Sequence, residues 1–187
     1  MKILGIDPGS IRCGYALLED LGGRVPLLRE AGTWNLGEST PLPQRLGRLQ
    51  EHLESLLQAH NPDRLCLEES FVHRNVHTAM VLGQARGVIL AGCARRGMAI
   101  DELSPSEAKK TVAGSGRASK EAVAEMCRRL LGMDTLPVGP DASDALALAL
   151  ASLSRGRNAA LLGAQGSRKG FDMDAYLKRI GKAGSAR

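Results

Sequence analysis

The chain has 187 residues, of which 43% are hydrophobic, 3% aromatic and 24% charged, and its formal net charge is +5. This length predicts one domain with a buried core, and no apolar run approaches the length of a membrane span. The four cysteines lie far apart without a CxxC pair. We therefore expect reduced thiols rather than disulfides or a zinc site, and a cytoplasmic protein. Asp7 interrupts the first apolar run too early for a signal peptide.

The positive charge is concentrated at the C-terminal end. Residues 155–187 hold eight Lys or Arg and two Asp, whereas the rest of the chain is close to neutral. Gly and Ser accompany the basic residues, so we expect residues 156–187 to form a mobile basic tail after a domain of residues 1–155. Such a tail suits contact with nucleic acid, and a tail that its charge keeps solvated explains the composition equally well.

The first predicted element is a buried strand that ends in a carboxylate. The apolar run of residues 3–6 predicts the strand, Asp7 follows it, and Pro8-Gly9 turns the chain. Residues 14–18 predict a second strand that runs back. Because an isolated carboxylate is costly to bury, Asp7 suits holding a metal or approaching a phosphate. The alternative is that it only initiates the turn.

Strands and helices alternate in the next part of the chain. Weak alternation predicts a third strand at residues 24–33, and leucines at helical spacing predict an amphipathic helix at residues 43–60. Residues 65–67 form a second apolar run, which leads into Glu68 and Glu69. This strand therefore also ends in carboxylates.

A long helix is predicted at residues 76–96. Charged side chains, Arg86 among them, indicate a soluble helix rather than a membrane span. Small residues recur at every fourth position along it, at Ala79, Gly83, Gly87 and Ala91. A row of this kind lets another backbone approach closely.

One strand and three helices complete the predicted domain. Residues 98–103 predict the strand, and the capping box Ser104–Glu107 predicts a helix that is broken at Gly114. A further helix is expected at residues 119–131. The last helix is rich in Ala and Leu and opens at Asp141.

Asp141 and Asp144 are three residues apart, so on a helix they share a face. Asp141 is a natural N-cap and the helix dipole favours acidic residues in the first turn, so the pair alone has a sufficient structural explanation. Asp7 and Glu68 extend the pair to a set of four. If the helix packs across both strand ends, the four carboxylates converge and require cations, for which Mg²⁺ or Mn²⁺ is the natural choice.

Five blocks of the sequence resemble the RuvC-type Holliday junction resolvases, which are crossover junction endodeoxyribonucleases. They match in order and spacing up to about residue 153, and they are Gly5–Gly9 with Gly14-Tyr15, Leu67-Glu68 with Phe71, Leu82–Gly87, Lys109–Val112 with Gly114, and Asp141–Ala145. The resemblance implies an α/β, RNase H-like fold, a mixed five-stranded sheet with helices on both faces. The first three strands would be antiparallel.

The resemblance also implies the reaction and its partners. Its members act as homodimers that nick opposed strands of a four-way DNA junction symmetrically, which leaves 5′-phosphate ends, in recombination and repair with the RuvA–RuvB branch-migration complex. Two Mg²⁺ ions per subunit, with Mn²⁺ as a substitute, would be held by Asp7, Glu68, Asp141 and Asp144 as catalytic residues. Some members carry His where this chain has Asp141, so this ligand is the most exchangeable.

DNA contacts are expected at Phe71, Lys109, Lys110, Arg117 and Lys120. Lys109 and Lys120 align with basic residues that the family uses near the cut phosphate, although exposed lysines are also ordinary surface charge. Phe71 would stack on an unpaired base from a loop that faces the junction, and a core position is the alternative. His73 and His77 have the spacing of some zinc ligands, but without a third ligand in register we favour phosphate contact or plain solvation.

Several alternatives remain at this stage. The row of small residues resembles the family's dimer helix, and packing on the protein's own sheet is the other explanation. Sugar kinases and actin-like proteins also open with a strand, Asp and Gly, but they need two such lobes. The YqgF-type RNase H-like nuclease lacks the blocks at residues 82–87 and 109–114, and a non-enzymatic junction-binding protein would need neither magnesium nor Asp7.

Overall fold

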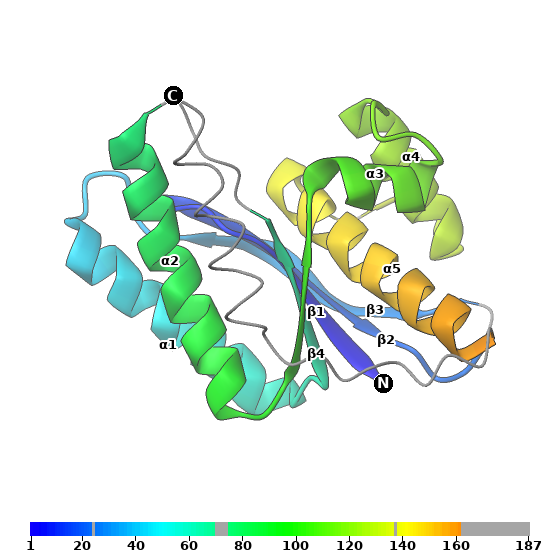
Figure 1. Cartoon of the computed structure of the whole chain (residues 1–187), viewed down its shortest axis with the longest axis horizontal. Helices are drawn as coiled ribbons and strands as arrows, with labels where there is room; N and C mark the ends of the chain where they lie inside the picture. The colour runs from blue at the N-terminus through cyan, green and yellow to red at the C-terminus, as the bar shows by residue number, and fades with distance from the viewer. Residues whose placement is uncertain (24, 70–74, 137, 162–187) are drawn as a thin grey trace, which may run out of the picture.

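The structure is a computed structural model that describes residues 1–23, 25–69, 75–136 and 138–161 (Figure 1). Its strands are β1 (Lys2–Asp7), β2 (Arg12–Glu19), β3 (Leu27–Asn35), β4 (Arg64–Glu68) and β5 (Ala99–Leu103). Its helices are α1 (Leu42–His60), α2 (Val76–Arg95), α3 (Pro105–Ala113), α4 (Lys120–Leu130) and α5 (Pro140–Leu161). None of these helices is long and apolar enough to cross a membrane, a finding that covers the described residues.

The strands form one mixed sheet in the order β3-β2-β1-β4-β5. β1, β2 and β3 pair antiparallel, whereas β4 and β5 run parallel to β1. α1 and α2 lie on one side of the sheet, and α5 lies on the other side with α3 and α4 (Figure 1). The predicted five-stranded mixed sheet with helices on both faces is therefore confirmed. The third strand was predicted too early, because pairing with β2 carries β3 on to Asn35.

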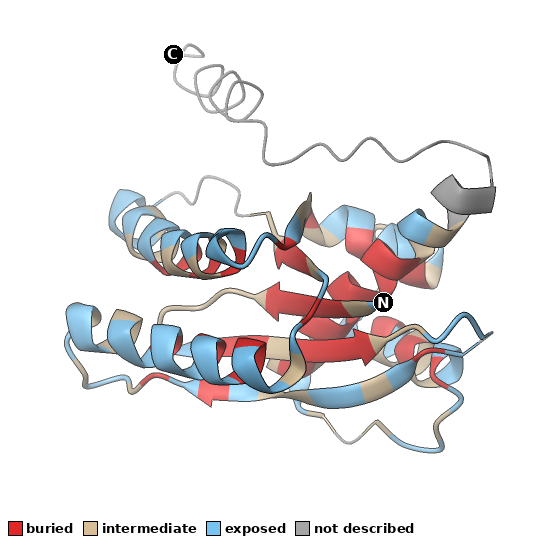
Figure 2. Cartoon of the chain, turned by 90° about the horizontal axis from the view of Figure 1, so that it is seen from below, coloured by how far each residue is buried: buried red, intermediate tan, exposed pale blue. Residues whose placement is uncertain are grey.

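Alternation along β1 decides which side chains face which layer of helices. Leu4 and Ile6 belong to the core between the sheet and α1 and α2, whereas Ile3 belongs to the core under α5. Side chains alternate between the faces of a strand, so Gly5 and Asp7 lie on the α5 face with Ile3. The central strands are buried between the two helical layers (red in Figure 2).

Two glycines let α5 lie directly on the sheet. A Cβ atom added at Gly5 would lie 2.1 Å from the carbonyl oxygen of Ala145, and one added at Gly14 would lie 2.1 Å from that of Asp141. Gly14 is also the β2 partner of Asp7. The first turn of α5 therefore lies over the end of β1.

We expect Gly5→Ala to destabilise the fold by about 2 kcal/mol or more, because the new Cβ would collide with the backbone of α5. Gly47→Ala is the matched control, since Gly47 lies in α1 with open space around its Cβ position. The control should stabilise the chain by about 0.5–1 kcal/mol through helix propensity. Urea unfolding measures both, and equal effects of the two variants would mean that α5 does not contact β1 closely.

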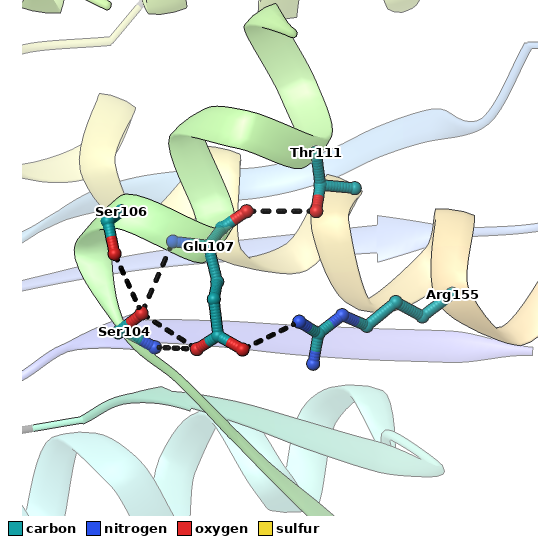
Figure 3. A network of polar contacts seen from close by, with 5 residues as sticks. All are labelled: Ser104, Ser106, Glu107, Thr111 and Arg155. Atoms are coloured by element: carbon teal, nitrogen blue, oxygen red, sulfur yellow. Dashed lines mark hydrogen bonds and ion pairs between the residues drawn. The ribbon is translucent and has the colours of Figure 1, made fainter. Parts of the chain in front are cut away.

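The predicted capping box at the start of α3 is present. The Ser104 side chain accepts from the Glu107 amide, and the Glu107 carboxylate accepts from the Ser104 amide (Figure 3). Arg155 of α5 reaches the same carboxylate at 3.1 Å. These hydrogen bonds and this ion pair lower the pKa of Glu107 to about 2. They also attach α3, which carries Lys109 and Lys110, to α5.

The small residues of α2 face away from the sheet. Gly83 and Gly87 are exposed and a Cβ at either would meet open space, so the row of small residues does not pack on the protein's own sheet.

The last helix is longer than the sequence predicts. α5 continues to Leu161, into the segment predicted as a tail, and Arg157 pairs with Asp20 at 2.7 Å. Residues 162–187 lie outside the described residues. All four cysteines are buried, and none of them forms a disulfide.

Candidate active site

Asp7 and Glu68 stand at the ends of neighbouring parallel strands. The register pairs Ile6 of β1 with Leu67 of β4, so the two carboxylates that follow are adjacent. Cys66 belongs to the core under α5, whereas Leu67 belongs to the opposite core. Alternation therefore places Glu68, rather than Glu69, on the face that carries Asp7.

α5 brings Asp141 and Asp144 to the same place. The helix begins at Pro140, so Asp141 lies inside its first turn and is not the N-cap that the sequence suggested. Burial and the charges of Glu68, Asp144 and Asp141, in that order, together raise the pKa of Asp7 to about 7, while Lys120 opposes them. This repulsion indicates that the other three carboxylates lie near Asp7.

Basic side chains engage the two aspartates of α5. Lys120 Nζ lies 2.7 Å from Asp144 Oδ2, and Arg12 Nε lies 3.5 Å from Asp141 Oδ2. The hydrogen bond to Asp144 and the charges of Asp144, Asp7 and Asp141 raise the pKa of Lys120. The carboxylate cluster is thus partly neutralised by the protein's own cations.

The chemistry of the cluster suits a hard divalent cation. All four candidate ligands are half-buried carboxylates, and like charges close together favour a cation. In their present orientations, however, the described side chains include no group of three or more His, Cys, Asp or Glu ready to hold a metal ion. A cation would have to displace Lys120 and Arg12, whose side chains are 63% and 67% exposed and so can move.

Only some of the predicted DNA-contacting residues are shown to lie near the carboxylate cluster. Lys109 on α3 and Lys120 at the start of α4 both lower the pKa of Glu68, which burial and Asp144 raise, so both lie near the cluster. Lys110 and Arg117 are exposed, in α3 and in the loop that follows it. Phe71 and His73 lie outside the described residues. His77 is exposed in the first turn of α2.

Sequence reasoning used Arg86 only as a sign of a soluble helix and missed its contacts. Arg86 is 8% exposed, donates to the carbonyl oxygen of Glu68 and pairs with Glu102. A signal was present in the sequence. Arg86 stands three and seven residues before Ile89 and Cys93, and these spacings put it on the apolar, buried face of α2.

Known proteins resemble this chain over its whole described domain. The family model described as "Crossover junction endodeoxyribonuclease RuvC" matches residues 3–152. A protein of that name from Halorhodospira halophila is 46% identical over 149 residues, which cover 80% of this chain and 87% of the relative.

Solved structures show the same similarity. The RuvC structure of Thermus thermophilus is 30% identical with a TM-score of 0.76, and the match covers 84% of this chain and 96% of that one. A second structure shows the T. thermophilus protein in complex with Holliday junction substrate, at 27% identity and a TM-score of 0.76. The yeast mitochondrial resolvase Ydc2, at 16% identity and a TM-score of 0.59, shares the fold.

Proposed function

Since the chain belongs to the RuvC family of crossover junction endodeoxyribonucleases, we propose that it resolves four-way DNA junctions by cation-dependent nicking of opposed strands. The observation that carries the proposal is the convergence of Asp7, Glu68, Asp141 and Asp144 from three separate elements. A non-enzymatic junction-binding protein has no use for this arrangement, because buried carboxylates repel the phosphates of DNA. The likeness to the T. thermophilus protein bound to its junction supports the choice of substrate.

We assign the four carboxylates as ligands of two Mg²⁺ ions, with Mn²⁺ as a substitute. Such ions supply a water of lowered pKa and stabilise the charge on the departing oxygen. Asp7, whose charge interacts with those of all three other carboxylates, would be the central ligand of the set. Lys120, which now pairs with Asp144, would be free to bind a phosphate oxygen of the cut strand if Asp144 served as a metal ligand. Lys109 approaches the cluster from α3. The products would carry 5′-phosphate ends.

Symmetric nicking needs two sites, and we propose that a homodimer supplies them. Gly83 and Gly87 leave α2 an exposed surface that another backbone can approach closely. We also propose, on the family resemblance, that the dimer acts with the RuvA–RuvB complex in recombination and repair. Four buried free thiols suit the reducing cytoplasm.

The direct test is incubation with an end-labelled four-way junction and Mg²⁺, beside a linear duplex of the same sequence. We expect paired nicks at opposed positions of the junction and no cutting of the duplex. Equal cutting of both substrates would remove the junction from the proposal, and binding without cleavage at any concentration of Mg²⁺ or Mn²⁺ would favour the non-enzymatic alternative.

Removal of residues 162–187 should weaken junction binding and make it less sensitive to salt. This truncation removes six Lys or Arg and two Asp, and it keeps α5 and the pair between Arg157 and Asp20. The slope of log affinity against log salt should become shallower by about one or more, since each lost phosphate contact releases about one counterion fewer. Cleavage at saturating protein should stay within about twofold of the full chain. An unchanged slope would show that the tail does not contact the DNA.

A further inference from the structure

A buried arginine joins the end of β4 to two other elements. Arg86 projects from α2, donates through Nη1 to the carbonyl oxygen of Glu68, and pairs through Nη2 with Glu102 Oε1 on β5. The Arg86 side chain is 10% exposed and that of Glu102 15%. One guanidinium therefore joins α2, β4 and β5 at Glu68, which is a candidate metal ligand.

The end of β4 needs such a restraint. The Glu68 carboxylate is half-buried near Asp144, and burial and this neighbouring charge both raise its pKa. Repulsion of this kind pushes the side chain and its strand end away from the cluster. The planar guanidinium fork can donate to the Glu68 carbonyl oxygen and to the Glu102 carboxylate in two fixed directions, which an ammonium cannot do with a single nitrogen.

We propose that Arg86 is a positioning residue, which fixes the backbone at Glu68 through Glu102 so that the Glu68 carboxylate faces Asp7. The inference rests on the proposed function only for the role of Glu68 as a metal ligand, and not for its position. Residues that orient a metal ligand from behind typically change metal affinity or activity by about 10–100-fold when they are replaced.

The same two strands contain a matched control. Arg64 at the start of β4 makes two hydrogen bonds to Asp101 of β5, at 2.8 and 2.7 Å. This pair also joins β4 to β5, but at the opposite end of β4 from Glu68. Replacement of each arginine by lysine keeps the charge and removes the fork, so the two variants differ in whether Glu68 loses its support.

Hydrogen exchange gives a readout that does not depend on any activity. The Glu69 amide donates to the carbonyl oxygen of Leu103 at 2.7 Å, directly beside the Glu68 carbonyl that Arg86 holds. In Arg86→Lys this amide should exchange about tenfold faster, whereas in Arg64→Lys it should exchange as in the original chain. Glu102→Gln keeps the shape of the Glu102 side chain and should also speed the exchange of the Glu69 amide, by a smaller factor. It replaces Arg86→Lys in the test if that variant fails to fold.

Cation titration of junction cleavage gives the second readout. Arg86→Lys should require about tenfold more Mn²⁺ for half-maximal cleavage, with junction affinity in the absence of cation unchanged, and Arg64→Lys should match the original chain. An unchanged Glu69 exchange rate in Arg86→Lys and Glu102→Gln, or equal effects of Arg86→Lys and Arg64→Lys in both readouts, would overturn the inference. Failure of the original chain to cut junctions would instead contradict the proposed function, and the exchange rates would still decide whether Arg86 holds the strand end.

Discussion

Asp7→Asn should abolish junction cleavage and leave junction binding intact or stronger. Asp7 is the carboxylate on which the other three act, so the loss of its charge removes the centre of the cation site. The same change removes repulsion between the protein and the phosphates of the junction. We expect a fall in the cleavage rate of several orders of magnitude, because the cations that would activate the water and stabilise the departing oxygen lose a ligand.

Asp134→Asn is the control for this variant, because Asp134 is exposed and should keep full activity after the same chemical change. Gel-shift titration without cation measures junction binding, and end-labelled junction with Mg²⁺ measures cleavage. Loss of binding by Asp7→Asn, with circular dichroism unchanged, would show that Asp7 acts in recognition rather than in catalysis.

The difference in stability between Asp7→Asn and the original chain should depend on pH in a defined direction. The pKa of Asp7 rises from 3.8 to about 7 in the cation-free fold, so ionisation of this group opposes folding. Its contribution to stability is complete below about pH 4 and is lost as the pH rises through about 7. At pH 8 without cation, Asp7→Asn should therefore be more stable than the original chain, by no more than about 4 kcal/mol. Added Mg²⁺ should stabilise the original chain and not the variant.

Glu68→Gln should lose nearly all cleavage, whereas Glu69→Gln should retain most of it. Glutamine keeps the shape and hydrogen bonding of glutamate but removes the charge that cations require. The alternation of β4 places Glu68 on the face of Asp7, and the next residue follows on the other side. A loss of at least about a hundredfold is expected for Glu68→Gln, and less than about threefold for Glu69→Gln.

The neighbouring variant is itself the control, since both residues lie at the end of one strand and carry the same charge. Cleavage rates across a Mg²⁺ titration measure both. The reverse pattern, with Glu69→Gln inactive and Glu68→Gln active, would shift the working register of β4 by one residue and contradict the site assignment.

Much of the fold could be predicted because local signals agreed with the tertiary structure. The apolar runs before Asp7 and Glu68 became adjacent strands, and the capping box at Ser104 began α3 as expected. The start of α5 was less predictable. Asp141 suits an N-cap, but Pro140 is equally suited to the first helical position and extends the helix by one residue.

Features that depend on contacts between distant segments could not be predicted from local pattern. Nothing near Gly5 or Gly14 indicates that the backbone of α5 will lie against them. The spacing of Arg86 to Ile89 and Cys93 places it on the buried face of α2, but its partners Glu102 and the Glu68 carbonyl lie on other elements and could not be predicted from that spacing. Local pattern likewise left the choice between Glu68 and Glu69 open, and only the family resemblance selected Glu68. The two cores place Glu68 on the side of β4 that faces α5.

The central claim is that β1, β4 and α5 bring carboxylates together to hold the cations of a nuclease. The most direct measurement is an anomalous difference map from crystals of the chain grown with Mn²⁺ at a concentration that supports junction cleavage. Our account predicts a peak within coordination distance of Asp7 and Glu68, with the Lys120 ammonium displaced from Asp144. A bound Mn²⁺ ion elsewhere, with Lys120 still paired to Asp144 and no peak beside Asp7, would contradict it.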